Sequence, residues 1–177
     1  MKGRLVDLDM VADAGGERET LSDGREVTVR PIRPGDGDAL VEAFERLSAR
    51  SKQLRFGSAP HALGASTLRH LIDSVDGVNH VAFAAFDDAA RLVGVARILR
   101  YPDDPDTLDV GMVIADDYQD AGLGHVLGDL LATHRPRPAK RILTSVSADN
   151  SRVMSLLRSF GVTPEWSGTG VVIEIPE

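Results

Sequence analysis

The chain has 177 residues, a formal net charge of -7 and no cysteine. Its length fits one domain around a single core, and the missing cysteine excludes disulfides, thiolate zinc sites and a cysteine nucleophile. The negative charge argues against nonspecific binding to nucleic acid or to an anionic membrane, and no apolar run approaches the roughly 18–20 residues that cross a bilayer. We therefore expect a cytoplasmic protein, monomeric or homodimeric. The histidines show no metal-ligand spacing, so we expect no metal.

The first twenty residues have no regular hydropathy period and contain the run Ala14-Gly15-Gly16. This composition predicts a flexible N-terminal arm over 1–20, followed by one domain over 21–177. The arm also lacks the continuous apolar region of a signal peptide.

From Leu21 onward the pattern becomes regular. Alternating or short apolar runs bounded by turn residues predict strands, at 26–30, 80–86, 91–100, 107–115, 141–147 and 169–175. Apolar residues at helical spacing predict helices, at 36–47, 66–75, 121–134 and 150–160, with 48–56 as a loop or a second short helix. The proline- and acid-rich segment 101–106 is predicted to be a turn. This order of elements predicts a mixed α/β (α+β) sandwich without repeats or internal linkers.

The strand–loop–helix segment 110–131 carries the strongest functional signal. Its loop holds Gln119, Gly122 and Gly124, and the helix that follows has a continuous apolar stripe. A helix N-terminus binds anions because its first N–H groups are unpaired and its dipole is positive there, and glycine lets the backbone approach a phosphate. A plain glycine-containing junction explains the same pattern equally well. With Gly128 the glycines are also loosely like a dinucleotide-binding turn, although no opening βαβ unit precedes them.

The run Gln119-Asp-Ala-Gly-Leu-Gly124 resembles the Q/R-x-x-G-x-G/A signature of the GCN5-related N-acetyltransferase (GNAT) family. The segment 27–36 is similar to the family's first strand and turn, and 150–162 is similar to its asparagine-led helix. Stretches near 30–34, 45–56 and 92–106 resemble bacterial protein-lysine acetyltransferase domains. The resemblance implies a GNAT-type mixed, mostly antiparallel sheet of six to seven strands flanked by about four helices. It also implies acetyl transfer from acetyl-CoA to a primary amine.

The same resemblance implies which residues contact the cofactor. Main-chain groups of Met112, Val113 and Ile114 would contact its pantetheine arm, and Gly111 suits a bulge in that strand. Asn150 would reach the pantetheine or the thioester while also capping its helix. The pyrophosphate would lie against the backbone N–H groups of Gln119, Asp120, Ala121, Gly122, Leu123, Gly124 and His125.

Acetyl transfer needs a neutral amine, and a lysine amine has a solution pKa of about 10.4, so a general base is useful. In the protein-lysine subgroup a glutamate on this strand serves, and Asp109 stands at its position. Strand alternation places Leu108, Val110, Met112 and Ile114 on one face and Asp109 on the other. A solvated carboxylate at a strand end would explain Asp109 without catalysis.

Three features depart from the family. Aspartate is one methylene shorter than glutamate, Leu157 stands where many members have a tyrosine that protonates the leaving thiolate, and the loop is acidic at Asp116, Asp117 and Asp120. A protein lysine is the first choice of acceptor, and a small-molecule amine is second. The alternative from another class is a catalytically weakened GNAT domain that binds acyl-CoA as a sensor or partner module.

Overall fold

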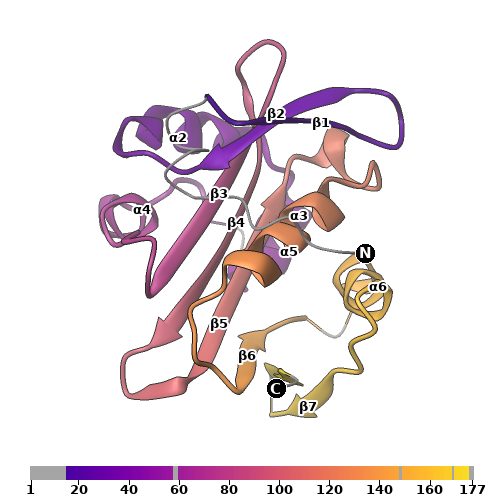
Figure 1. Cartoon of the computed structure of the whole chain (residues 1–177). Helices are drawn as coiled ribbons and strands as arrows, with labels where there is room; N and C mark the ends of the chain where they lie inside the picture. The colour runs from indigo at the N-terminus through magenta and orange to yellow at the C-terminus, as the bar shows by residue number, and fades with distance from the viewer. Residues whose placement is uncertain (1–14, 58–59, 148, 169, 176–177) are drawn as a thin grey trace.

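The computed structural model describes residues 15–57, 60–147, 149–168 and 170–175. Within them, eight strands form one sheet in the order β1-β2-β3-β4-β5-β6-β8-β7, and only the β5–β6 pair is parallel. The mixed, mostly antiparallel sheet predicted from the sequence is therefore confirmed, with eight strands rather than six or seven and five α-helices rather than about four (Figure 1). This topology excludes the dinucleotide-binding alternative, which needs a mostly parallel sheet.

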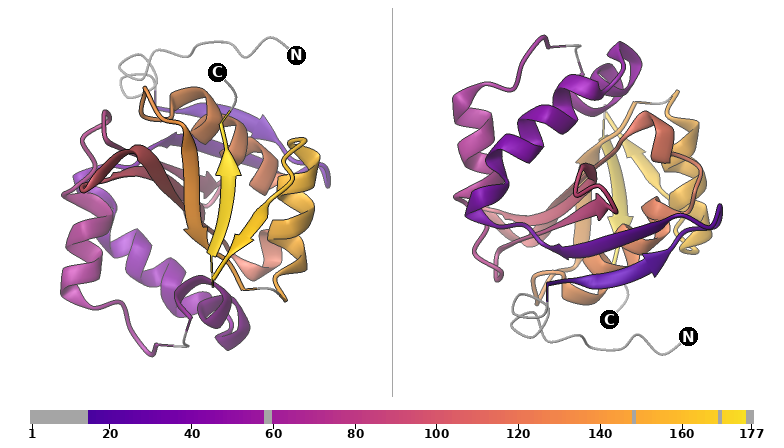
Figure 2. Two further views of the ribbon diagram at one scale, coloured as in Figure 1. Left: turned by 90° about the horizontal axis from the view of Figure 1, so that it is seen from below. Right: turned by 90° about the horizontal axis from the view of Figure 1, so that it is seen from above.

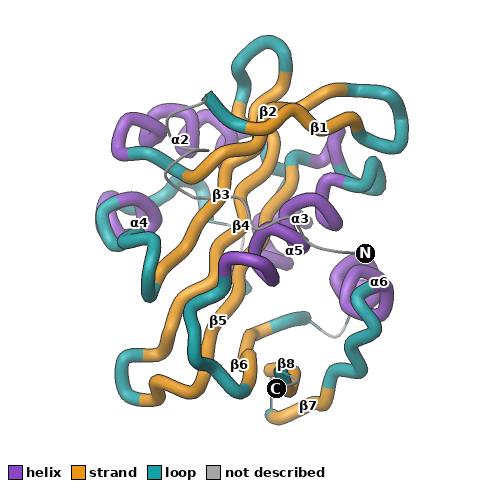
Figure 3. Tube along the Cα trace, in the orientation of Figure 1, coloured by secondary structure: helices purple, strands orange, loops and turns teal. Residues whose placement is uncertain are grey.

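The strands are β1 (Glu17–Thr20), β2 (Glu26–Pro31), β3 (His80–Asp87), β4 (Leu92–Tyr101), β5 (Asp104–Ile114), β6 (Arg141–Ser145), β7 (Glu165–Ser167) and β8 (Gly170–Glu174). The α-helices are α2 (Gly37–Arg46), α3 (Ala49–Phe56), α4 (Ala65–Ile72), α5 (Leu123–His134) and α6 (Ser151–Ser159), with 3-10 turns η1 (Pro34–Asp36) and η2 (Asp116–Tyr118). Figure 3 shows how these helices, strands and loops follow one another along the chain.

Two strands, β1 and β7, were not predicted from the sequence, and both lie at an edge of the sheet. β1 pairs with β2 from Glu17↔Val29 to Thr20↔Glu26, so the last residues of the predicted arm join the sheet; residues 1–14 lie outside the described part. A Cβ on Gly16 would stand 2.7 Å from the Thr28 side chain, so this glycine permits close approach to β2. β7 is fully exposed. Edge strands bury few side chains, so hydropathy does not mark them.

The turn between β4 and β5 is shorter than the sequence predicts. Tyr101 pairs with Asp104, so both strands run into the segment expected to be a turn. Apolar alternation marks only the buried part of a strand, and the exposed hairpin end is held by main-chain pairing.

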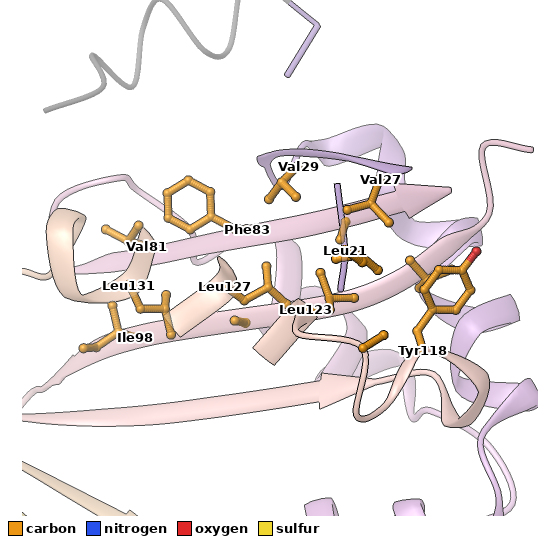
Figure 4. Close-up of a cluster of buried hydrophobic side chains, with 14 of the residues drawn as sticks. Leu21, Val27, Val29, Val81, Phe83, Ile98, Tyr118, Leu123, Leu127 and Leu131 are labelled. Atoms are coloured by element: carbon orange, nitrogen blue, oxygen red, sulfur yellow. The ribbon is translucent and has the colours of Figure 1, made fainter. Parts of the chain in front are cut away.

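Helices cover both faces of the sheet. Figure 2 shows α2, α3 and α4 on one side of the central strands and α5 on the other. Figure 4 shows Leu123, Leu127 and Leu131 of α5 facing strand side chains such as Phe83. Ala82 and Ala84 of β3 belong to a separate cluster of buried hydrophobic residues on the other face, which includes residues of α2 and α4. β3 is thus buried on both faces, which explains its continuous apolar sequence.

The sheet opens between β5 and β6. Their parallel pairing is limited to Thr107↔Arg141 and Leu108↔Ile142, whereas β5 stays paired with β4 as far as Ile114. The two strands therefore diverge beyond Leu108, and the β6-facing edge of β5 is left without a strand partner there (Figure 1). This opening positions the site described below.

Candidate active site

The loop before α5 presents free main-chain donors. Gly122 is the N-cap of α5 in a left-handed conformation (φ 89°), and no side chain caps the helix. Asp120 is also left-handed (φ 61°), which turns the chain sharply just before the helix. Among the described residues, the N–H groups from Asp120 to Gly124 bond no acceptor. The segment predicted to hold a pyrophosphate thus presents unpaired N–H groups at a helix N-terminus, an arrangement suited to an anion; we call residues 120–124 the cradle.

Contacts outside the cradle occupy two of the three loop carboxylates. Asp116 accepts hydrogen bonds from the Ser48 N–H (2.9 Å), the Ser48 hydroxyl (2.8 Å) and the Ser51 hydroxyl (2.7 Å), which join the start of α3 to η2. Burial raises the pKa of Asp116, but these donors outweigh it and hold the pKa below its usual range. Asp120 pairs with Arg152 of α6 at 3.0 Å. The negative charge of the loop is therefore partly compensated, because Asp120 pairs with Arg152 and Asp116 accepts hydrogen bonds.

The Gln119 side chain is a brace within the loop. Its amide nitrogen donates to the Ile114 carbonyl (3.0 Å) and to the Ser51 hydroxyl (3.2 Å). The main-chain N–H of Gln119 bonds the Asp116 carbonyl (3.4 Å), and the His125 N–H bonds the Gly122 carbonyl (3.0 Å), so the two ends of the predicted set of N–H donors are already paired. Gly128, by contrast, serves packing, because a Cβ there would lie 2.7 Å from the Phe160 ring.

Along β5, the main-chain N–H and C=O groups of successive residues point alternately toward β4 and toward the opening. The Ala115 N–H bonds Val93 of β4, whereas the Val110 carbonyl accepts from the Thr144 hydroxyl of β6 at 2.7 Å. By alternation, Met112 directs its N–H and C=O into the opening, and Val113 directs them toward β4. The Ile114 carbonyl also faces the opening, where Gln119 occupies it.

Asn150 caps α6 with its amide oxygen, which accepts from the Val153 N–H at 3.2 Å. Its amide NH2 group remains the part that can reach a ligand. His125 is exposed on α5 beside Phe160, with ring centroids 5.7 Å apart. The cradle, Met112 and Asn150 thus come from three elements that border the same opening.

The opposite face of β5 carries charged side chains. Val110, Met112 and Ile114 pack with α5 as the alternation predicts, and Asp109 projects from the other face, half-buried. The guanidinium groups of Arg55 of α3 and Arg97 of β4 both lie within electrostatic reach of Asp109. Tyr101 is also within reach of Asp109; burial and then this carboxylate raise the pKa of Tyr101. Its hydroxyl donates to the Leu143 carbonyl at 3.2 Å.

Gly111 is not a bulge, because it pairs with Arg97 in unbroken register. A Cβ at Gly111 would lie 2.5 Å from Nη2 of Arg55, so the glycine makes room for that guanidinium group. Arg97 was not among the site residues predicted from the sequence. The sequence marks it only as a charged residue inside the apolar run 92–99.

In the part of the chain that the structure describes, no group of three or more histidine, aspartate or glutamate side chains is arranged to hold a metal ion. No helix in the described ranges combines the length and apolarity needed to cross a membrane.

No protein-family model matches the chain. An acetyltransferase of Pseudomonas aeruginosa is 32% identical over 139 residues, which are 77% of this chain and 74% of that protein. Among solved structures, the GNAT domain of PAT from S. lividans is similar with a TM-score of 0.80 and 24% identity, over 92% of this chain and 97% of that one. Salmonella typhimurium yncA, solved with its cofactor acetyl-CoA, has a TM-score of 0.65 and 13% identity, over 84% of this chain and 92% of that one.

Because a relative of this identity and coverage is an acetyltransferase and the fold is that of GNAT domains, the chain belongs to the GNAT acetyltransferase family, for which acetyl-CoA is the typical cosubstrate.

Proposed function

We propose that the chain transfers the acetyl group of acetyl-CoA to a primary amine, with Asp109 as general base. The observation that carries the proposal is the opening between β5 and β6, bordered by the unpaired N–H groups of 120–124 and backed by a carboxylate on the far face of β5. The residues present fit the cosubstrate, since a pyrophosphate needs clustered N–H donors and a pantetheine arm needs a free strand edge.

Each element has a distinct role in this scheme. The cradle from Asp120 to Gly124 binds the pyrophosphate through main-chain N–H groups, and Met112 offers the strand edge. When bound, acetyl-CoA supplies the acetyl group as a reactive thioester. Asp109 takes the proton of the attacking amine, directly or through water. Asn150 orients the ligand with its free amide group, while fixed N–H groups in a water-poor site stabilise negative charge that develops there.

A protein lysine is our first choice of acceptor. The support is the resemblance of 30–34, 45–56 and 92–106 to bacterial protein-lysine acetyltransferase domains. The net charge of -7 also favours a cationic partner over an anionic one. A small-molecule amine is the second choice.

The catalytically weakened alternative has its own support. Leu157 on α6 cannot donate a proton to a leaving thiolate, and Asp109 is shorter than glutamate. A domain that kept the cradle and lost turnover would bind acyl-CoA as a sensor.

The test has two steps. Calorimetry measures acetyl-CoA binding, and a thiol reagent then follows CoA release with lysine peptides and with small amines. The chain has no cysteine of its own to react. Binding with turnover supports the enzyme, and binding without turnover across a broad acceptor panel supports the sensor. No binding at micromolar acetyl-CoA refutes both.

A further inference from the structure

Arg97 is half-buried, and part of its guanidinium group lies inside the protein. Its Nε and Nη1 atoms are buried and make no hydrogen bond within the described residues. Burial, followed by repulsion from Arg55, lowers the pKa of Arg97, and Asp109 acts in the opposite direction. Arginine nevertheless stays charged near neutral pH. A charge held in this way destabilises the free protein, because desolvation is not compensated.

Arg55 approaches the same place from α3. Its guanidinium group lies against Gly111, the residue that pairs with Arg97 across the strands. It forms no hydrogen bond or ion pair within the described residues, and its carbon Cζ lies 5.2 Å from the centroid of the Phe56 ring. Burial lowers the pKa of Arg55, opposed by Asp109. Two guanidinium groups therefore share one site with a single carboxylate nearby.

Both arginines line a pocket between the sheet and the helices α2, α3 and α4. The remaining wall is largely apolar and comes from α2, α4, β4 and β5. The pocket lies on the face of β5 that carries Asp109, opposite the face covered by α5. Asp109 is not part of the pocket wall, but it lies within electrostatic reach of both arginines that are.

We infer that the acceptor carries a carboxylate near its amine, and that Arg55 and Arg97 bind this carboxylate while Asp109 receives the amine proton. This inference rests on the proposed function and narrows its substrate class. Guanidinium groups match carboxylates in geometry and charge, and an incoming carboxylate in the pocket would supply a counter-charge to the two arginines that line it. The carboxylate could belong to a small amino acid or to an acidic residue beside a lysine in a peptide.

The test uses acceptors matched in pairs. ω-Amino acids of increasing chain length are compared with alkylamines of equal length, and lysine peptides with a glutamate neighbour are compared with the glutamine versions. We expect the carboxylate member of the best pair to have about 10- to 100-fold higher kcat/KM, the range for a charge-assisted hydrogen bond. The pair that shows this preference identifies the source of the carboxylate.

Variants separate binding from structure. Arg97→Met should bring the kcat/KM ratio within the best pair close to one, while raising the melting temperature because a half-buried charge is removed. Arg97→Lys should keep part of the preference. Arg69→Gln removes an exposed arginine of α4 and should change neither property.

A second readout does not need turnover. The acetylated products of the same pairs are titrated into the protein, and the shift in melting temperature is measured for the native chain and for Arg97→Met. The inference is supported if only the carboxylate product raises the melting temperature and if Arg97→Met loses this effect. That result holds even if no acceptor is turned over, an outcome that would refute the enzyme but not the inference. Equal kcat/KM and equal thermal shifts within every pair would overturn the inference while leaving acetyl transfer intact.

Discussion

His80 at the start of β3 makes the stability of the fold depend on pH. Its side chain is 5% exposed, its Nδ1 lies 2.9 Å from the Ser74 hydroxyl, and its buried Nε2 has no hydrogen-bond partner among the described residues. Burial first, and then repulsion from Arg97 and His70, lowers the pKa of His80 from 6.5 to about 4. The folded protein therefore holds this imidazole neutral where the unfolded chain would protonate it.

The magnitude follows from linkage. The pKa difference is 6.5 minus about 4, or about 2.5 units, and each unit corresponds to about 1.4 kcal/mol, so the full effect is about 3 kcal/mol. Because the folded pKa is the lower one, this stability is present above pH 6.5 and is lost as the pH falls toward 4. His80→Asn has no group that titrates in this window, so its unfolding free energy should fall less steeply.

Urea denaturation of both proteins at intervals from pH 7.5 to 4.5 measures the difference. Other titrating groups, including His134 with its pKa lowered by burial, contribute equally to both curves and cancel in the comparison. An NMR titration of His80 gives its pKa independently. Parallel stability curves, or a His80 pKa near 6.5, would refute the assignment of His80 as a buried neutral imidazole.

Three further predictions concern the site and its supports. Asp109→Asn should lower kcat/KM by about 100- to 10,000-fold, the usual contribution of a general base, with acetyl-CoA binding by calorimetry unchanged; unaltered turnover would place the base elsewhere. Gly122→Ala should lower the unfolding free energy by about 1–2 kcal/mol because φ is 89°, and should also weaken acetyl-CoA binding. Gly161→Ala (φ 72°) is its control, with a similar loss of stability and unaltered binding. Equal acetyl-CoA binding by both variants would contradict the proposal that the cradle holds the pyrophosphate. Gly128→Ala places a Cβ 2.7 Å from the Phe160 ring, and displacing that ring should remove, in thermal unfolding, the roughly 1 kcal/mol that alanine otherwise gains over glycine inside a helix. Phe160→Leu in the same chain should recover part of that gain, and additive effects of the two changes would contradict the contact.

Much of the fold was readable from the sequence because burial repeats with the period of each element. The alternation along 108–114 assigned the two faces of β5, and the leucines of α5 marked the helix that covers one of them. The loop from Gln119 to Gly124 was recognisable as a candidate anion site, because its glycines and the start of the helix are neighbours in the sequence. Edge strands such as β1 have no such mark, because their partners lie elsewhere in the sequence.

The tertiary structure decided what depends on distant segments meeting. The opening between β5 and β6 follows from strand pairing that stops at Leu108, and the compensation of Asp120 needs Arg152 from another helix. The meeting of Arg55 and Arg97 over Gly111 joins α3 to two strands that lie far from it in the chain. By itself the sequence determined the buried elements, their buried faces and the position of a candidate anion-binding loop, because those depend on neighbours along the chain. Only the three-dimensional fold placed two cations and one carboxylate on a common face, because electrostatic partners are chosen by distance in space.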